Sequence, residues 1–220
     1  MQRSASPKVK KQTRPTSNEM DTADNVQGGE RCVQVLQAAE ECFRTHGFHA
    51  TSIQRISDVA GMSPGHIYHY FRNKEAIVAG IVEHRLTEAL EHVEIVRQNS
   101  QTTGVVEAWI AQIETGMASC INREQTPIDL EILAEATRNE AVAGMVQQAD
   151  AVARARILDL VKQLPVLRRL PPRELAARLT VMKTIFDGLA IRTLCDPSMN
   201  RAATLRVIKR VIRTLLEEAD

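Results

Sequence analysis

The feature that most constrains this chain is a signal that ends one helix, followed within three residues by a signal that begins the next. Gly61 follows a short apolar helical pattern, and glycine is the usual residue just after a helix end. Ser63 and Pro64 then begin another pattern, because serine caps helix N-termini and proline suits the first helical turn. The sequence therefore predicts two short helices joined by the turn 61–63.

A longer helix is predicted on either side of this pair. Apolar residues recur every three or four positions from about Glu30 to His46, and Gly47 follows as a C-cap. The run 51–54 has the pattern of a capping box, in which the Thr51 hydroxyl and the Gln54 side chain satisfy each other's backbone N–H groups. Asn73 is the predicted cap of the next long helix.

The rest of the chain also has helical periodicity. Aromatic residues make up only 3% of the sequence, and alternating β-branched runs are almost absent. The predicted fold class is all-α, with about nine helices. We expect a disordered basic arm over 1–28, a three-helix helix-turn-helix head over 29–76, and a larger helical body for ligand binding and dimerisation over 77–220.

Two short helices with a glycine-containing turn, and a third helix packed across them, make a helix-turn-helix unit. A recognition helix of about 8 residues rises roughly 12 Å, which is comparable to the width of the DNA major groove. The face of 64–70 opposite Ile67 carries Gly65 and polar-tipped side chains, and a glycine within a helix suggests a close approach to the backbone. These features favour DNA binding.

The stretch from Ala50 through Ile77, ATSIQRISDVAGMSPGHIYHYFRNKEAI, resembles the DNA-binding head of TetR-type (tetracycline repressor-like) transcriptional regulators. The resemblance in detail covers about Glu30 to Ile81, and the body matches in length and helix count. Many relatives carry a basic residue in place of Pro64 and threonine in place of His66, which affects the bases that are read. The DNA-binding residues implied by the resemblance are Thr51 or Ser52, Arg55, Ser63, Pro64, Gly65, His66, Tyr68, His69, Tyr70 and Lys74.

The resemblance also implies a homodimer that is formed through the last two long helices as a four-helix bundle. Apolar stripes on 175–189 and 205–215 are what such a bundle needs, although the same stripes could bury against the monomer's own core. The predicted interface residues are Leu175, Leu179, Met182, Leu205, Ile208 and Ile212.

Relatives respond to small molecules that bind inside the body, so we expect an effector of unknown identity. Methionine and aromatic side chains suit adaptable apolar pockets, and ordinary core packing is the alternative for each of them. The candidate pocket residues are Trp109, Ile113, Met117, Met145, Met182 and Phe186. One helical face also carries Glu131, Glu135, Arg138 and Asn139, which could orient a ligand or simply face solvent. If Glu131 or Glu114 pointed inward, a cationic ligand would be plausible, because a buried carboxylate needs a partner.

Charge and cysteine spacing bound the remaining possibilities. The net charge is +1, yet the first eighteen residues hold five basic residues and no acid, so this arm either binds phosphates or is a solvated leader. The four cysteines lack metal-site spacing and are expected to be small buried hydrophobes. No apolar run is long enough to span a bilayer, and residues 1–18 lack the apolar core of a signal peptide, so we expect a cytoplasmic protein without membrane association.

Two other classes of function were compared with DNA binding. His66 and His69, with His84 downstream, could be drawn as a metal or acid/base site, but no cysteine or carboxylate cluster completes it and no catalytic glycine motif appears. We therefore expect a protein that has no enzymatic activity and binds no metal or cofactor. A helical interaction protein without DNA binding would have little reason to keep both a basic arm and a polar recognition face. The prediction is a ligand-responsive repressor that binds a palindromic operator as a dimer and is released by a small molecule. The alternative is an activator or a ligand-independent regulator of the same fold.

Overall fold

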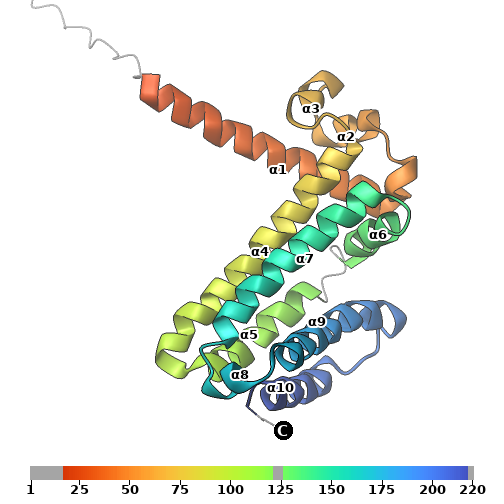
Figure 1. Ribbon diagram of the computed structural model, residues 1–220. Coiled ribbons are helices and arrows are strands. Elements are labelled where there is room, and N and C mark those ends of the chain that lie inside the picture. Colours follow the sequence, from red (N-terminus) through yellow and green to blue (C-terminus); the bar gives the residue numbers. More distant parts are fainter. Residues whose placement is uncertain (1–16, 121–125, 218–220) are drawn as a thin grey trace, which may run out of the picture.

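The computed structural model describes residues 17–120 and 126–217 of the 220-residue chain, and of residues 17–28, 116–120 and 166 only the backbone is described (Figure 1). Every regular element in these ranges is a helix, so the all-α prediction is confirmed. The ten helices are α1 (Ser17–Ala50), α2 (Ile53–Ala60), α3 (Pro64–Tyr70), α4 (Lys74–Thr103), α5 (Val105–Cys120), α6 (Thr126–Ala136), α7 (Glu140–Val161), α8 (Pro165–Arg169), α9 (Pro172–Cys195) and α10 (Arg201–Glu217).

The predicted start and stop signals around the two short helices are confirmed. Gly61 adopts the left-handed conformation (φ 64°, ψ 31°) and ends α2. Ser63 caps α3, because its hydroxyl accepts the His66 N–H, and Asn73 caps α4 by accepting the Ala76 N–H. Gly47 has φ 77° and ψ 165°, which interrupts the helical conformation within α1.

Helix α1 begins earlier than the sequence pattern indicated. Its backbone is helical from Ser17, whereas a helix was predicted from about Glu30 and a disordered arm over 1–28. The five basic residues of the arm lie outside the described residues.

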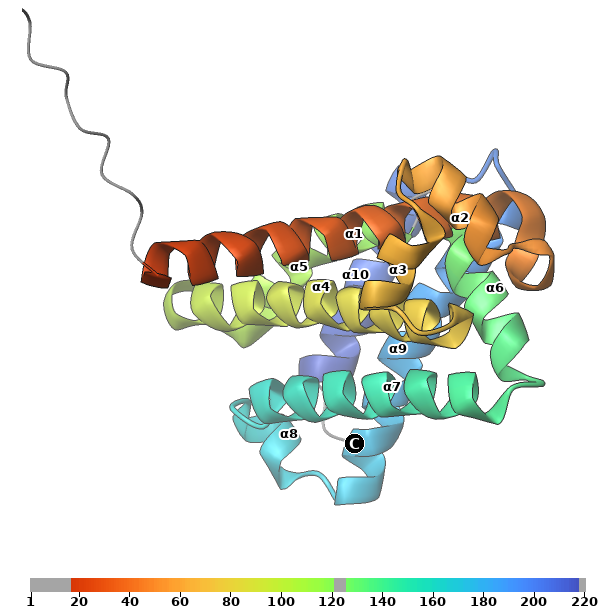
Figure 2. The ribbon, with the colours of Figure 1, turned by 90° about the horizontal axis from the view of Figure 1, so that it is seen from above.

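Helix α4 is the central element, and it packs against both α5 and α7. Figure 1 and Figure 2 show α4 and α7 running alongside one another. Figure 1 shows α2 and α3 at one end of the molecule and α8 to α10 towards the other. Helix α6 contacts both α1 and α7. It therefore connects the helix-turn-helix unit to the rest of the chain.

The core of the helix-turn-helix unit extends into the body. Ile56, Ile67 and Ile77 are fully buried in one apolar cluster with side chains of α1 and α4. Ile132 of α6 and Val142 of α7 belong to the same cluster. The head therefore shares buried surface with α6 and α7.

A second cluster fills the space between α5, α8, α9 and α10, and it corrects the predicted dimer interface. Five of the residues expected to face a partner are buried in this cluster, and the sixth, Leu205, is half-buried against it. The five are Leu175, Leu179, Met182, Ile208 and Ile212. These stripes stabilise the monomer's own core, so a partner would have to meet the opposite faces of the two helices.

Cysteine burial follows the prediction only in part. Cys42 is buried and Cys32 is half-buried, but Cys195 at the end of α9 is exposed. The Cys120 side chain lies outside the described residues. No helix in the described part of the chain is long and apolar enough to cross a membrane.

Two neighbouring residues on α6 test the shared core. Ile132 is 7% exposed and Leu133 is 50% exposed. We expect Ile132→Ala to lower the free energy of unfolding by about 2–5 kcal/mol, because it leaves a cavity between head and body. Leu133→Ala is the matched control and should change it by less than about 0.5 kcal/mol. Urea unfolding of both variants measures the difference, and equal stabilities would contradict the shared core.

Candidate nucleic-acid interface and body cavity

Helix α3 presents an exposed face on a buried anchor. Ile67 is fully buried, whereas Gly65, His66, Tyr68 and His69 are exposed. Tyr70 is half-buried, and its ring lies 5.4 Å from the His66 ring and 5.1 Å from the His69 ring, measured between centroids. The exposed side chains therefore offer hydrogen-bonding and aromatic groups on a short rigid helix.

Gly65 is the position on this face where another molecule could come closest to the α3 backbone. A β-carbon built at Gly65 would meet no atom within 4 Å, so nothing inside the described structure requires a glycine there. Glycine within a helix costs about 1 kcal/mol relative to alanine. A molecule that approaches the α3 backbone from outside would account for it.

The turn between α2 and α3 is fixed by hydrogen bonds. The Ser57 hydroxyl donates to the Met62 carbonyl at 2.7 Å, and the Met62 N–H donates to the Ser57 carbonyl at 3.1 Å. The Gln34 side chain on α1 donates to the Ala60 carbonyl at 2.8 Å. These bonds hold α3 in a fixed orientation relative to α1 and α2.

The predicted capping box does not form, and the N-cap lies one residue later than expected. Ser52 is the N-cap of α2, because its hydroxyl accepts the Arg55 N–H at 3.2 Å. Thr51 is 1% exposed, and its hydroxyl donates to the Gly47 carbonyl at 2.8 Å and faces the Cys42 carbonyl at 3.2 Å. Gln54 donates instead to Asp58. Of the two candidates for a phosphate contact, only Ser52 reaches the surface.

The remaining expected DNA contacts differ in how accessible they are. Arg55 is exposed, with its guanidinium donating to the Ala50 carbonyl at 3.3 Å, and Ser63 is also exposed. Pro64 is half-buried in the first turn of α3. The Lys74 ammonium donates to the Phe48 carbonyl at 2.8 Å and lies 4.4 Å from the centre of the Phe48 ring. Lys74 thus stabilises the head internally.

Two carboxylates of α6 bind the turn that follows the Gly47 break, and we call these contacts the α6 clasp. Glu131 Oε1 accepts the Phe48 N–H at 2.6 Å. Glu135 is buried, and its Oε2 lies 3.0 Å from His49 Nε2. Both side chains were expected to orient a ligand or to face solvent, and the structure places them against the head.

Further contacts position the Glu135 carboxylate. Asn139 donates to its Oε1 at 3.1 Å, and Arg138 Nε lies 3.6 Å from its Oε2. Glu114, the other carboxylate considered for a cationic ligand, is exposed on α5 and bonds Lys209 of α10 at 2.7 Å. The cluster of polar residues at 131–139 therefore joins head to body, and Glu114 joins α5 to α10.

The body contains a cavity of about 660 Å³. It is bounded by side chains from α4, α5, α6 and α9, and three of the expected pocket residues, Trp109, Ile113 and Phe186, line it. Met182 is buried in the core beside it and Met145 lies on α7 away from it, while the Met117 side chain is outside the described residues. The other lining residues include Arg85, Glu88, His92, Val93, Val96, Asp129, Leu130, Leu133, Lys183 and Asp187.

Sequence reasoning missed the charged part of this cavity. Arg85 lies 3.0 Å from Glu40, 3.3 Å from Glu88 and 3.6 Å from Asp129, so its guanidinium joins α1, α4 and α6. Burial raises the pKa of Asp129, and Arg85 opposes that rise. The acidic and basic residues of α4 have no spacing that distinguishes these from solvated ones, so only the tertiary contacts reveal them.

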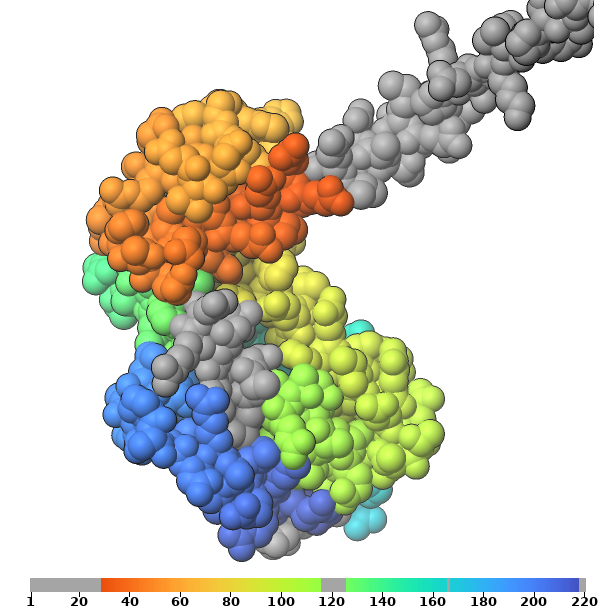
Figure 3. All heavy atoms as spheres, turned by 180° about the vertical axis from the view of Figure 1, so that it is seen from behind, coloured from red at the N-terminus to blue at the C-terminus, as the bar shows by residue number. Residues whose placement is uncertain are grey.

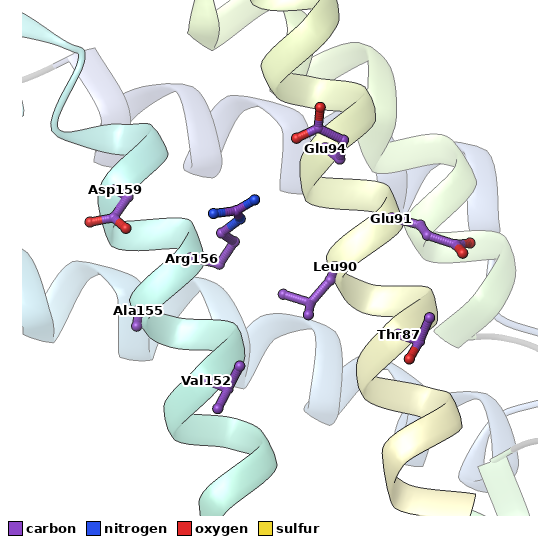
Figure 4. Close-up of a pocket in the computed structure, with 8 residues that line it drawn as sticks. All are labelled: Thr87, Leu90, Glu91, Glu94, Val152, Ala155, Arg156 and Asp159. Atoms are coloured by element: carbon purple, nitrogen blue, oxygen red, sulfur yellow. The ribbon is translucent and has the colours of Figure 1, made fainter.

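A second hollow is an open groove of about 620 Å³ between α4 and α7. Figure 4 shows Leu90 of α4 and Arg156 of α7 pointing into it, while Glu91 points away. Arg97 and Gln98 bond the neighbouring Glu94 carboxylate and lower its pKa to about 2. Because the groove is open and most of its lining side chains are exposed, the body cavity is the better candidate for a small-molecule site.

The three histidines singled out in the sequence each have a side-chain neighbour. The His66 ring makes a tilted contact with Tyr70, the His69 ring meets Tyr70 edge-on, and His84 lies on α4 near Glu88. Within the described ranges, no group of three or more histidine, cysteine or acidic side chains is placed to hold a metal ion.

Known protein families match both the head and the body of the chain. Residues 35–81 match the family model "Bacterial regulatory proteins, tetR family", and residues 118–217 match the model "BetI-type transcriptional repressor, C-terminal". The chain is 31% identical over 114 residues to the HTH-type transcriptional regulator UidR of Escherichia coli (strain K12), which covers 52% of this chain and 56% of UidR. It therefore spans about half the length of the curated relatives it matches.

Solved structures share the fold over nearly the whole described chain. Salmonella enterica GusR superposes with a TM-score of 0.71 at 23% identity, covering 86% of this chain and 96% of GusR. The regulator FadR from Bacillus subtilis, in complex with stearoyl-CoA, superposes with a TM-score of 0.63 at 14% identity, covering 86% and 99% of the two chains.

The role of Thr51 can be tested by stability. We expect Thr51→Val to lower the free energy of unfolding by about 1–2 kcal/mol, because the near-isosteric valine leaves two carbonyls at the end of α1 without this donor. Ser52→Ala should lower it by about 1 kcal/mol through loss of the α2 cap. Chemical denaturation of both variants gives the values. A Thr51→Val protein as stable as the parent would show that the hydroxyl has no structural role.

Proposed function

The chain belongs to the tetR family of bacterial regulatory proteins, and from this premise we propose that it is a cytoplasmic homodimeric repressor that binds a palindromic operator and is released by a small molecule. That it is a DNA-binding transcriptional regulator follows from the family. The dimer, the operator symmetry, repression and ligand release are the proposed parts.

The observation that carries the proposal is the exposed face of α3. A capped helix with one buried anchor, an open glycine and exposed histidine and tyrosine side chains fits a recognition helix in a major groove. Ser52 and Arg55 of α2 and Ser63 at the start of α3 are the proposed phosphate contacts beside it. The base contacts are assigned to Gly65, His66, Tyr68 and His69, with Tyr70 supporting the two histidine rings.

A second copy of the chain is the proposed partner of α9 and α10. The faces of these helices that point away from the core expose large apolar side chains, which are Val181, Ile191, Leu194, Val207 and Val211. Gly188 lies among those on α9, and a β-carbon there would meet no atom within 4 Å. Figure 3 shows α9 and α10 at one margin of the molecule, below the lobe formed by the head. Pairing these faces would bury them and place two recognition helices on one duplex.

Helix α6 offers a route from the body cavity to the head. Asp129, Leu130 and Leu133 line the cavity, while Glu131 and Glu135 form the α6 clasp with the head. A ligand that favours a different position of α6 would therefore favour a different orientation of the head. Release from DNA then follows if the ligand binds this second arrangement more tightly than the operator-bound one.

The recognition helix can be tested with a random duplex library followed by a histidine variant. We expect selection of an inverted repeat, with affinity that falls steeply as salt increases because phosphate contacts release counterions. His69→Ala should weaken specific binding about five- to tenfold, which corresponds to ~1 kcal/mol for one lost hydrogen bond. His84→Ala, on α4 away from this face, is the matched control. Unchanged operator affinity for His69→Ala would count against α3 as the reading element.

The dimer face can be tested with a charge. We expect Val211→Asp to weaken dimerisation at least about a hundredfold, because a two-fold interface would bury the unpaired carboxylate twice. Val152→Asp, which places the same charge on an exposed position of α7, should leave the dimer intact. Sedimentation equilibrium distinguishes the two species, and a dimeric Val211→Asp protein would exclude this face.

A further inference from the structure

The body cavity has two chemically different ends. Arg85 and Glu88 lie on α4 near the head, with Asp129 of α6 beside them. Val93 and Val96 follow two to three turns later on α4 and pack with Trp109 of α5. Along a helix axis, the distance from residue 85 to residue 96 is roughly 16 Å. The cavity therefore fits an elongated molecule with one polar and one apolar end.

At the polar end, carboxylates outnumber the cationic group they surround. One guanidinium, that of Arg85, faces Glu40 at 3.0 Å, Glu88 at 3.3 Å and Asp129 at 3.6 Å. Burial raises the pKa of both Glu40 and Asp129 and the neighbouring carboxylates add to that rise, while Arg85 opposes it at both groups, His84 at Glu40 and Lys183 at Asp129. His84 Nδ1 lies 3.9 Å from Glu88, on the more exposed side. One further positive charge would lower the electrostatic energy of this group.

The two cations that line the cavity already have acidic partners. Arg85 faces three carboxylates, and the Lys183 ammonium bonds Asp187 one turn along α9. The Arg85 Nε atom is buried without a hydrogen-bond acceptor among the described residues, but an anionic ligand bound there would bring a further negative charge to a group that already holds three carboxylates. Asp129, with the longest contact to Arg85, is the carboxylate most easily drawn to a ligand.

We infer that the cavity binds a monocation with an apolar body. An ammonium or amidinium group bonds Asp129 and Glu88, and the apolar body lies between Trp109 and Phe186. Cation and carboxylate then form charge-assisted hydrogen bonds, and the apolar body is removed from water. This inference rests on the proposed ligand-responsive function and names the chemical class of its effector.

Occupation of the polar end also reaches the head. Glu40 belongs to α1, and its carboxylate shares the Arg85 guanidinium with Asp129. When a cation binds Asp129, the Arg85 guanidinium keeps only Glu40 and Glu88 as ion-pair partners. The ion pair between Glu40 of α1 and Arg85 of α4 then changes in strength. Binding at this end therefore alters two of the helices that pack against the head, α4 and α6.

The experiment uses Trp109, the single tryptophan of the sequence, as an optical probe inside the cavity. The full chain is titrated with phenylbutylammonium, phenylbutyrate and phenylbutanol, which share one apolar body and differ in charge. We expect the fluorescence of Trp109 to report binding of the cation at least roughly tenfold tighter than of the acid or the alcohol. Equal or tighter binding of phenylbutyrate, or no binding of the cation at millimolar concentration, would overturn the inference.

Variants locate the charge preference. Asp129→Asn should reduce affinity for phenylbutylammonium roughly tenfold and leave the affinity for phenylbutanol unchanged. Glu88→Gln, at a half-exposed position, should reduce the same preference and serves as a second variant if Asp129→Asn folds poorly. Asp159→Asn on the exposed side of α7 is the matched control. Undiminished preference for the cation in both cavity variants would contradict the assigned end.

Operator binding without any probe is measured on the same protein, so the two claims can fail separately. If the cation binds and the Asp129→Asn effect is seen in a protein that selects no DNA, the cavity assignment holds and the proposed function fails. If a selected operator is bound but the cation is not preferred, the proposed function holds and the cavity assignment fails.

Discussion

The backbone of Phe48 is held by two side chains from different parts of the chain, and the position of the head depends on both. Glu131 accepts its N–H at 2.6 Å, and the Lys74 ammonium donates to its carbonyl at 2.8 Å. Gly47 makes this possible, because its positive φ interrupts α1 and turns the next peptide groups away from the helix axis. A β-carbon at residue 47 would lie 3.1 Å from Glu131 Oε1, so the glycine also leaves room for the carboxylate. With His49 and Glu135, these contacts join the helix-turn-helix unit to α6 at one short turn.

The parts of the fold that the sequence predicts well are those decided by neighbouring residues. Gly61, Ser63 and Asn73 end or begin helices through their own backbone freedom or side-chain oxygens, and each does so in the structure. The predicted capping box does not form, and the cap lies one residue later, because Thr51 is buried against the carbonyl groups that end α1, a contact that depends on how α1 turns at Gly47. Only Thr51 has a glutamine three positions later, so the local pattern favoured Thr51 over Ser52, and the packing of Thr51 overrode it.

The parts that sequence predicts poorly are those in which one helix has two partners. Helix α9 buries Leu175, Leu179 and Met182 in the monomer while exposing Val181 and Ile191, and periodicity alone does not say which face meets which neighbour. Glu131 has the same difficulty, because its backbone partner lies 83 positions earlier in the chain. The exposed face of α3 was easier to predict, since Gly65, His66 and His69 gather within one short segment. The sequence predicted the aromatic residues that line the cavity, Trp109 and Phe186, but not the charged ones around Arg85.

The length of α4 has a mechanical consequence. Its 30 residues span about 45 Å, from Lys74 under the head to Thr103 at the far end of the body. A rigid rod of that length acts as a lever: a tilt of about 5° about one end displaces the other by about 4 Å, a sizeable part of the roughly 12 Å width of a major groove. Side chains that line the cavity from Arg85 to Val96 lie along the middle of this rod. A rearrangement too small to disturb the packing around Trp109 can therefore displace one end of α4 by several ångströms, which is enough to alter the contacts with DNA that are proposed for α3.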